Sequence, residues 1–179
     1  FIYELLQNAE DALARRNVWN GSRAVNFHLF PHMLYISHFG EPFNELDVRG
    51  ICGIGESTKE ETAIGYFGIG FKSVYAFTNR PEVHSGREDF AIENFVWPVA
   101  AAPLERDSAE TVFILPLNVE TDTAVEQITR GFRQLGVNTL LFLRQIEEIT
   151  WQVESGLSGF YLRDKPEQID DWVRRVTLL

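Results

Sequence analysis

A carboxylate, an amide and a second carboxylate stand near the start of the chain at spacings that place them on one side of a helix. Glu4, Asn8 and Asp11 occupy positions i, i+4 and i+7, and apolar residues at helical spacing over residues 1–16 predict an amphipathic helix. A carboxylate can orient and deprotonate water, and an amide oxygen can ligate Mg²⁺. These side chains suit phosphoryl chemistry; the alternative interpretation is an ordinary helix with a polar face.

A glycine-rich stretch further along the chain is suited to holding an anion. Gly65, Gly68 and Gly70 let the backbone approach a ligand closely and adopt φ > 0. The apolar pattern after them predicts a helix over residues 71–78, whose first N–H groups would face phosphates, and Lys72 would add a mobile cation. The stretch does not end like a Walker loop, and it lacks the strand-then-GxGxxG order of a dinucleotide-binding fold.

The hydrophobic pattern predicts the elements that position these two groups. Asn44 as N-cap, with Asp47 completing a capping box, predicts a helix over residues 45–52. Further helices are predicted at 123–136 and 139–143, and strands at 24–29, 33–37, 81–85, 90–97, 111–117, 146–154 and 159–163. This order predicts an α+β two-layer sandwich, with helices on one face of a mixed sheet.

Composition limits the classes of function. The chain has 16 Lys and Arg against 26 Asp and Glu, a formal net charge of −10. We expect no direct nucleic-acid binding, because phosphate contacts need a basic face. No apolar run reaches the ~18–20 residues of a membrane-spanning helix. A single cysteine, Cys52, excludes an internal disulfide and suits a reducing compartment. We therefore expect a cytoplasmic protein, with a nuclear location left open.

The length of 179 residues suits one domain over residues 1–179. Residues 156–179 are a candidate start of a following region. The helical pattern begins at Phe1 with no capping residue before it, which predicts that an N-terminal segment is missing.

Taken together, the two groups resemble the nucleotide-binding motifs of the GHKL superfamily of ATPases. The run ELLQNAEDA at residues 4–12 resembles the first nucleotide-binding box, and IGYFGIGFKS at 64–73 resembles the lid motif of the ninety-kilodalton heat-shock chaperones. ETVFILPL at 110–117 is similar to the last box, in which a threonine, here Thr111, contacts the nucleotide site. The resemblance implies the Bergerat ATP-binding fold, with a mixed, mostly antiparallel sheet covered by helices on one face.

The sacsin-like branch of the superfamily shares further segments with this chain. HFGEPF at residues 38–43 is followed by DVRGIC at 47–52 and by GESTK at 55–59, in the order that branch has. The likeness covers about residues 1–155.

The resemblance implies Mg²⁺-dependent binding and hydrolysis of ATP, with ATP and Mg²⁺ as the cofactors. Glu4 would be the catalytic base, since a carboxylate there favours hydrolysis over the phosphate transfer of histidine kinases, and Asn8 would ligate the metal and contact the nucleotide. The other residues implied to bind the nucleotide are Asp11, Ala12, His38, Gly40, Gly65, Tyr66, Phe67, Gly68, Ile69, Gly70, Phe71, Lys72 and Thr111. The 65–72 loop would close over the phosphates and exclude water.

The second box departs from the superfamily pattern. An aspartate there normally accepts a hydrogen bond from the adenine amino group, whereas this chain has His38, and Pro42 replaces a glycine. A neutral histidine can accept that bond, though less strongly than a carboxylate; the alternative is a buried structural histidine. These departures support a second hypothesis, an interaction module, nucleotide-binding or nucleotide-free, without turnover.

Expected partners are ATP, a second copy of the chain or other domains of a longer protein, because superfamily members use lid closure to switch such contacts. The biological process stays open among chaperone-like, chromatin-associated and defence roles.

Overall fold

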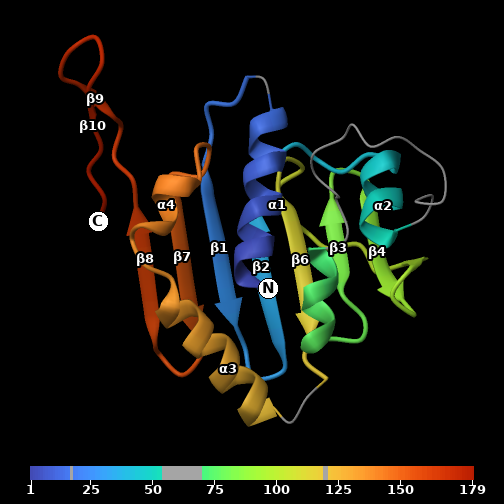
Figure 1. The fold of residues 1–179 in the computed structure, drawn as a ribbon. Helices are drawn as coiled ribbons and strands as arrows, with labels where there is room; N and C mark the ends of the chain where they lie inside the picture. The colour runs from blue at the N-terminus through green and yellow to red at the C-terminus, as the bar shows by residue number, and fades with distance from the viewer. Residues whose placement is uncertain (17, 54–69, 119–120) are drawn as a thin grey trace.

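The computed structural model describes residues 1–16, 18–53, 70–118 and 121–179 (Figure 1). The helices are α1 (Ile2–Arg15), α2 (Glu45–Cys52), the 3₁₀ helix η1 (Phe71–Ala76), α3 (Thr121–Gln134) and α4 (Thr139–Phe142). The strands are β1 (Ala24–Leu29), β2 (Met33–His38), β3 (Glu82–Ser85), β4 (Glu88–Glu93), β5 (Trp97–Ala100), β6 (Thr111–Pro116), β7 (Glu148–Val153), β8 (Ser158–Leu162), β9 (Glu167–Gln168) and β10 (Arg174–Arg175). Among the helices within these ranges, none is long and apolar enough to cross a bilayer.

One large mixed sheet forms the frame of the molecule. Its strand order is β5-β4-β3-β6-β2-β1-β7-β8. Strands β1 and β7 run parallel, and the other neighbouring pairs described in this sheet are antiparallel. After β8 the chain leaves the sheet and forms the small β9–β10 hairpin, away from the helices (Figure 1). The predicted α+β class, with a mixed and mostly antiparallel sheet, is confirmed.

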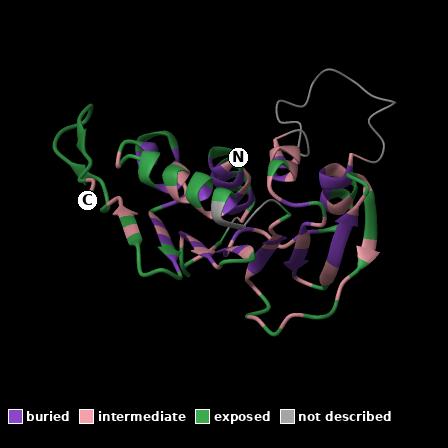
Figure 2. Ribbon diagram, turned by 90° about the horizontal axis from the view of Figure 1, so that it is seen from below, coloured by how far each residue is buried: buried purple, intermediate pink, exposed green. Residues whose placement is uncertain are grey.

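The helices lie on one side of this sheet, and the buried residues lie between the two layers (Figure 2). Alternate residues of each strand face the helices, as the period of two along a strand requires. Core side chains of the strands include Val25, Phe27, Leu34, Ile36, Phe113, Leu115, Ile149 and Val153, and the helices add Leu5, Leu6, Ala9, Leu13, Ile128 and Phe132. The expected two layers, with helices on one face, are confirmed.

The capping residues of α2 are those that the sequence predicts. The Asn44 side chain accepts hydrogen bonds from the backbone N–H groups of Leu46, at 2.8 Å, and Asp47, at 3.1 Å. The Asp47 carboxylate accepts in return from the Asn44 N–H at 3.0 Å, which completes the capping box. Gly53 ends the helix in the left-handed region, with φ of 68°.

Two predicted elements differ from the structure. The helix expected over 71–78 is the shorter 3₁₀ helix η1, in which the N–H and hydroxyl of Ser73 both donate to the Gly70 carbonyl, an i→i+3 pattern. The strand expected over 90–97 is divided between β4 and β5, because Asn94 and Phe95 adopt φ of 50° and 69° and turn the chain into a hairpin.

Candidate functional site

The carboxylate of Glu4 lies directly against Gly70. A side chain at position 70 would collide with it: the position of a Cβ there is 2.8 Å from the Glu4 Cδ atom. Gly70 has φ of −63°, an ordinary helical value, so the glycine is required for close approach rather than for its backbone freedom. The Ser73 hydroxyl donates to the Gly70 carbonyl at 2.7 Å and holds this residue in place. The acidic residue Glu4 of helix α1 therefore contacts Gly70, the last glycine of the glycine-rich stretch.

Asn8 and Asp11 lie one and two turns further along the same helix. Asn8 is partly buried, and its side chain forms no hydrogen bond with another described residue. Asp11 is exposed and accepts a hydrogen bond from the Gln7 amide at 3.2 Å. Both residues thus keep oxygens available for a ligand, on a helix anchored in the core by its opposite face.

Helix α1 also contacts the loop that follows β2. The Ala12 carbonyl accepts a hydrogen bond from the N–H of Glu41 at 2.8 Å. Gly40 packs so closely on this turn that a Cβ there would stand 3.0 Å from the Ala12 carbonyl carbon. The predicted binding residues Ala12 and Gly40 are therefore neighbours, although 28 positions separate them in the sequence.

His38 ends β2 beside this contact and is only 2% exposed. Its Nδ1 atom accepts a hydrogen bond from the N–H of Gly40 at 3.0 Å. Burial, assisted by the positive charges of Arg15 and Arg16, lowers the pKa of His38 to about 4. A neutral imidazole whose Nδ1 accepts carries its proton on Nε2, so the ring presents a donor where the sequence analysis expected an acceptor.

Thr111 lies across from His38 at the start of β6. Its side chain is buried, and its hydroxyl shares a short hydrogen bond with that of Ser85. The Ser85 hydroxyl also accepts from the N–H of Phe43 at 3.0 Å. Thr111 is thus in the predicted neighbourhood, with its hydroxyl tied to β3.

Two arginines that the sequence analysis did not single out tie the end of α1 to the loop after β2 and to α2. Arg16 donates to the Phe39 carbonyl at 2.6 Å and stacks over the Trp19 ring, with 3.8 Å between the guanidinium carbon and the ring centroid. Arg15 forms an ion pair of 2.6 Å with the buried Asp47 of α2. Basic residues in the last turn of a predicted helix are the signal that could have drawn attention to them.

The described residues of the glycine-rich stretch divide between core and surface. Phe71 is 1% exposed and packs on Phe113, so its side chain belongs to the core. The Lys72 ammonium group lies beside Gly53, 3.0 Å from the position of a Cβ there, at the C-terminal end of α2. The remaining predicted binding residues, Gly65, Tyr66, Phe67, Gly68 and Ile69, lie outside the described residues.

Glu10, within the first motif, has a structural role that the sequence analysis missed. It is 8% exposed, and its carboxylate accepts hydrogen bonds from the N–H groups of Arg144, Gln145 and Ile146 at 2.6 to 3.0 Å. Its spacing from Leu6 places it on the buried face of α1, and a carboxylate on an apolar face is a signal of such a role.

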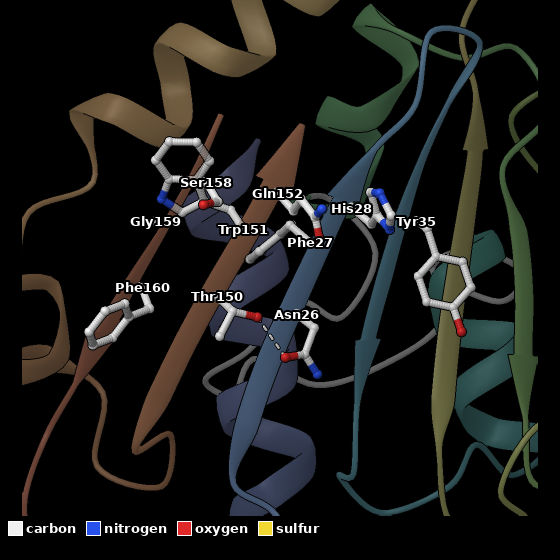
Figure 3. Close-up of a pocket in the computed structure, with 10 residues that line it drawn as sticks. All are labelled: Asn26, Phe27, His28, Tyr35, Thr150, Trp151, Gln152, Ser158, Gly159 and Phe160. Carbon is white, nitrogen blue, oxygen red and sulfur yellow. Dashed lines mark hydrogen bonds between the residues drawn. The ribbon is translucent and has the colours of Figure 1, made fainter. Parts of the chain in front are cut away.

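The face of the sheet opposite the helices carries a shallow hollow (Figure 3). It is lined by Asn26, Phe27, His28, Tyr35, Thr150, Trp151, Gln152, Ser158, Gly159 and Phe160. The Thr150 hydroxyl donates to the Asn26 side chain across it at 2.7 Å. Of the predicted nucleotide-binding residues that the structure describes, none lines this hollow, so it is separate from that part of the candidate site.

A buried polar cluster fixes the loop that follows β5. His84 Nδ1 lies 2.8 Å from an Asp89 carboxylate oxygen, and Arg106 donates to the same oxygen at 2.7 Å. Burial raises the pKa of Asp89, but the hydrogen bonds from His84 and the charge of Arg106 outweigh it, and the net pKa is lowered. The cluster joins the loop to β3 and β4.

Comparison with known proteins gives a partial assignment. The family described as "Sacsin domain" matches residues 33–94, which include β2, α2 and β3. Protein NO VEIN of Arabidopsis thaliana is 27% identical over 178 residues, covering 85% of this chain and 6% of the plant protein. Human sacsin is 46% identical over 54 residues, covering 29% of this chain and 1% of sacsin. These matches support a sacsin-like chain, and each spans a small part of a much longer relative.

Proposed function

We propose that the chain is a Bergerat-type ATP-binding domain of the GHKL superfamily that binds ATP with Mg²⁺ and hydrolyses it. The observation that carries the proposal is the contact between Glu4 and Gly70, because it joins the acid of the first motif to the last glycine of the second. The neighbouring positions of Ala12, Gly40 and His38 add support, since the resemblance assigns all three to the same nucleotide.

In this proposal Glu4 orients and deprotonates the water that attacks the γ-phosphate. Glu4 is exposed on α1, so its carboxylate is accessible to water. Lys72, two residues after Gly70, offsets negative charge on the phosphates.

The residues present fit a magnesium ion. Asn8 offers an amide oxygen without a hydrogen bond to another described residue, and the carboxylates of Glu4 and Asp11 flank it one turn away on each side. A bound Mg²⁺ would neutralise phosphate charge. Asn8 would hold it.

The domain would act as a conformational switch within a larger protein. Support for this comes from the matched relatives, of which the aligned regions form 6% and 1%. Nucleotide-dependent changes in one domain can alter contacts made by the rest of a chain.

The Glu4→Gln variant tests the assigned role. It keeps the shape and hydrogen-bonding capacity of the side chain but cannot take a proton, so we expect phosphate release from ATP to fall by about 10²-fold or more, with the Kd for ATP nearly unchanged. Glu126→Gln, which alters an exposed acid on α3, is the matched control and should retain wild-type turnover. Full turnover in Glu4→Gln would refute the role of Glu4.

His38 and Pro42 favour a second candidate, an interaction module that has lost turnover. Isothermal titration of ATP and Mg²⁺ alongside a phosphate-release assay separates the two functions. Heat of binding without phosphate release would support the module, and binding with release would support the ATPase.

A further inference from the structure

The two edges of the large sheet differ in how they are protected against a further strand. Strand β5 forms one edge and carries Pro98, whose nitrogen has no hydrogen to donate. Strand β8 forms the other edge (Figure 1), and its residues from Ser158 to Leu162 include neither a proline nor a charged side chain. Natural proteins block sheet edges with such residues, because free N–H and C=O groups pair with another chain. The β8 edge is therefore open to an added strand.

The segment around Leu179 already pairs with one end of this edge. The N–H of Leu162 donates to the Leu179 carbonyl and the N–H of Leu179 donates to the Leu162 carbonyl, both at 2.9 Å. The pairing is antiparallel. Because the backbone groups of successive residues alternate in direction along a strand, those of Ser158 and Phe160 face the same side as those of Leu162. No described strand pairs with these two residues on that side.

The Phe160 side chain adds a contact surface to this row of backbone groups. It is 62% exposed and lies at the β8 side of the hollow on the face opposite the helices (Figure 3). Residues directly opposite each other on paired strands point to the same face of a sheet. The residue of an added strand opposite Phe160 would therefore lie against its ring, where an aromatic or β-branched side chain makes the most favourable pair.

From these features we infer that the β8 edge binds an extended peptide segment of a partner protein, which pairs antiparallel with residues 158–160 in line with Leu179. Main-chain hydrogen bonds supply the affinity in this mode of recognition, and the side chain opposite Phe160 supplies specificity. The net charge of −10 favours a segment with lysine or arginine on its flanks. The inferred partner is thus a basic segment that alternates β-branched or aromatic residues with others.

Titration of a labelled peptide into the whole chain tests the inference. The probe alternates threonine and valine between terminal lysines and carries fluorescein, whose anisotropy reports binding. Phe160→Ser should raise the Kd about three- to fivefold, the effect of losing one favourable cross-strand pair. Trp97→Ser is the matched control and should leave the Kd unchanged, because Trp97 is also 62% exposed but lies on the opposite edge strand, β5.

Amide hydrogen exchange of the chain shows where the peptide pairs. With the peptide bound, the amides of Ser158 and Phe160 should exchange at least about tenfold more slowly, because they become donors to the added strand. The amides of Gly159 and Tyr161 face β7 and should change little. This alternation distinguishes strand pairing from a peptide that lies across the hollow without pairing.

Binding of the probe with slowed exchange at Ser158 and Phe160 supports the inference. Failure of the probe to bind, or binding without that alternation, overturns it. Slowed exchange of the same amides in the chain alone, together with a dimer in sedimentation, would also overturn it, because a second copy would then be the occupant. An unchanged Kd in a folded Phe160→Ser variant would contradict the role of the ring. The proposed function is tested separately, since none of these outcomes depends on a nucleotide.

Discussion

At the scale of single residues, the ionisation of His38 is coupled to folding. The imidazole has a pKa near 6.5 when exposed to water, and burial beside Arg15 and Arg16 lowers it to about 4 in the folded chain. Between these values the unfolded chain binds a proton that the folded chain does not. The free energy of unfolding therefore rises with pH through this window, and the contribution of His38 is lost as the pH falls below about 6.5.

This coupling predicts a pH dependence that one substitution removes. Urea unfolding at about pH 7.5 and pH 5.0 should show the wild type losing about 2 kcal/mol more than His38→Asn over that interval, from 1.36 kcal/mol per pKa unit. Carboxylates that titrate in the same range contribute equally to the loss in both proteins, so their contribution cancels when the two losses are subtracted. Equal losses in both proteins would show that His38 is not held neutral by its surroundings.

At the scale of elements, the approach of α1 to Gly70 sets the position of the Glu4 carboxylate. Because Gly70 has a backbone conformation that alanine adopts readily, Gly70→Ala adds a methyl group without backbone strain. The methyl group must displace Glu4. A shift of about 1 Å in a reacting group can cost about 10²-fold in rate.

We therefore expect Gly70→Ala to lower phosphate release at least about tenfold while the chain stays folded. Gly136→Ala is the control, because a Cβ at Gly136 would have no atom within 4 Å. Parallel measurement of turnover and of urea unfolding separates the effect on Glu4 from any effect on folding. Wild-type turnover in Gly70→Ala would mean that the carboxylate works from another position.

Local sequence patterns were sufficient to predict most helices and strands but not the contacts between them. The capping box of α2 and the alternation of apolar and polar residues in β1, β2 and β6 depend only on residues close together in the sequence. These elements lie where the patterns predict. The hairpin between β4 and β5 depends on two positive φ values that no glycine marks, one of them at Phe95. The contact of Glu4 with Gly70 depends on packing between elements, which periodicity does not encode.

At the scale of the whole molecule, two charged side chains hold the segment 140–146, one through its N–H groups and the other through its carbonyls. Glu10 of α1 accepts from three of its N–H groups, and Arg163, directly after β8, donates to the carbonyls of Leu140, Leu143, Arg144 and Ile146. The segment thereby joins the first helix to the last strand of the sheet. The sequence could not reveal this, because Glu10 and its partners are 134 to 136 positions apart.

The arrangement predicts that Glu10 and Arg163 are energetically coupled. Glu10→Gln places an NH₂ group against backbone donors, and Arg163→Met leaves carbonyls without a donor, so each should cost about 2 kcal/mol of unfolding free energy. Because both act on one segment, a double-mutant cycle should give a coupling of about 1 kcal/mol. Glu147→Gln, an exposed neighbour, should change stability by less than about 0.5 kcal/mol. Strictly additive losses would contradict a shared segment.

The central claim is that the acidic side of α1 faces the phosphates of a bound nucleotide. A crystal structure of the chain with Mg²⁺ and a non-hydrolysable ATP analogue tests it most directly. The account predicts the γ-phosphate beside the Glu4 carboxylate, with the metal ion on the Asn8 amide oxygen. An analogue bound elsewhere, for example in the hollow on the opposite face of the sheet (Figure 3), would contradict it.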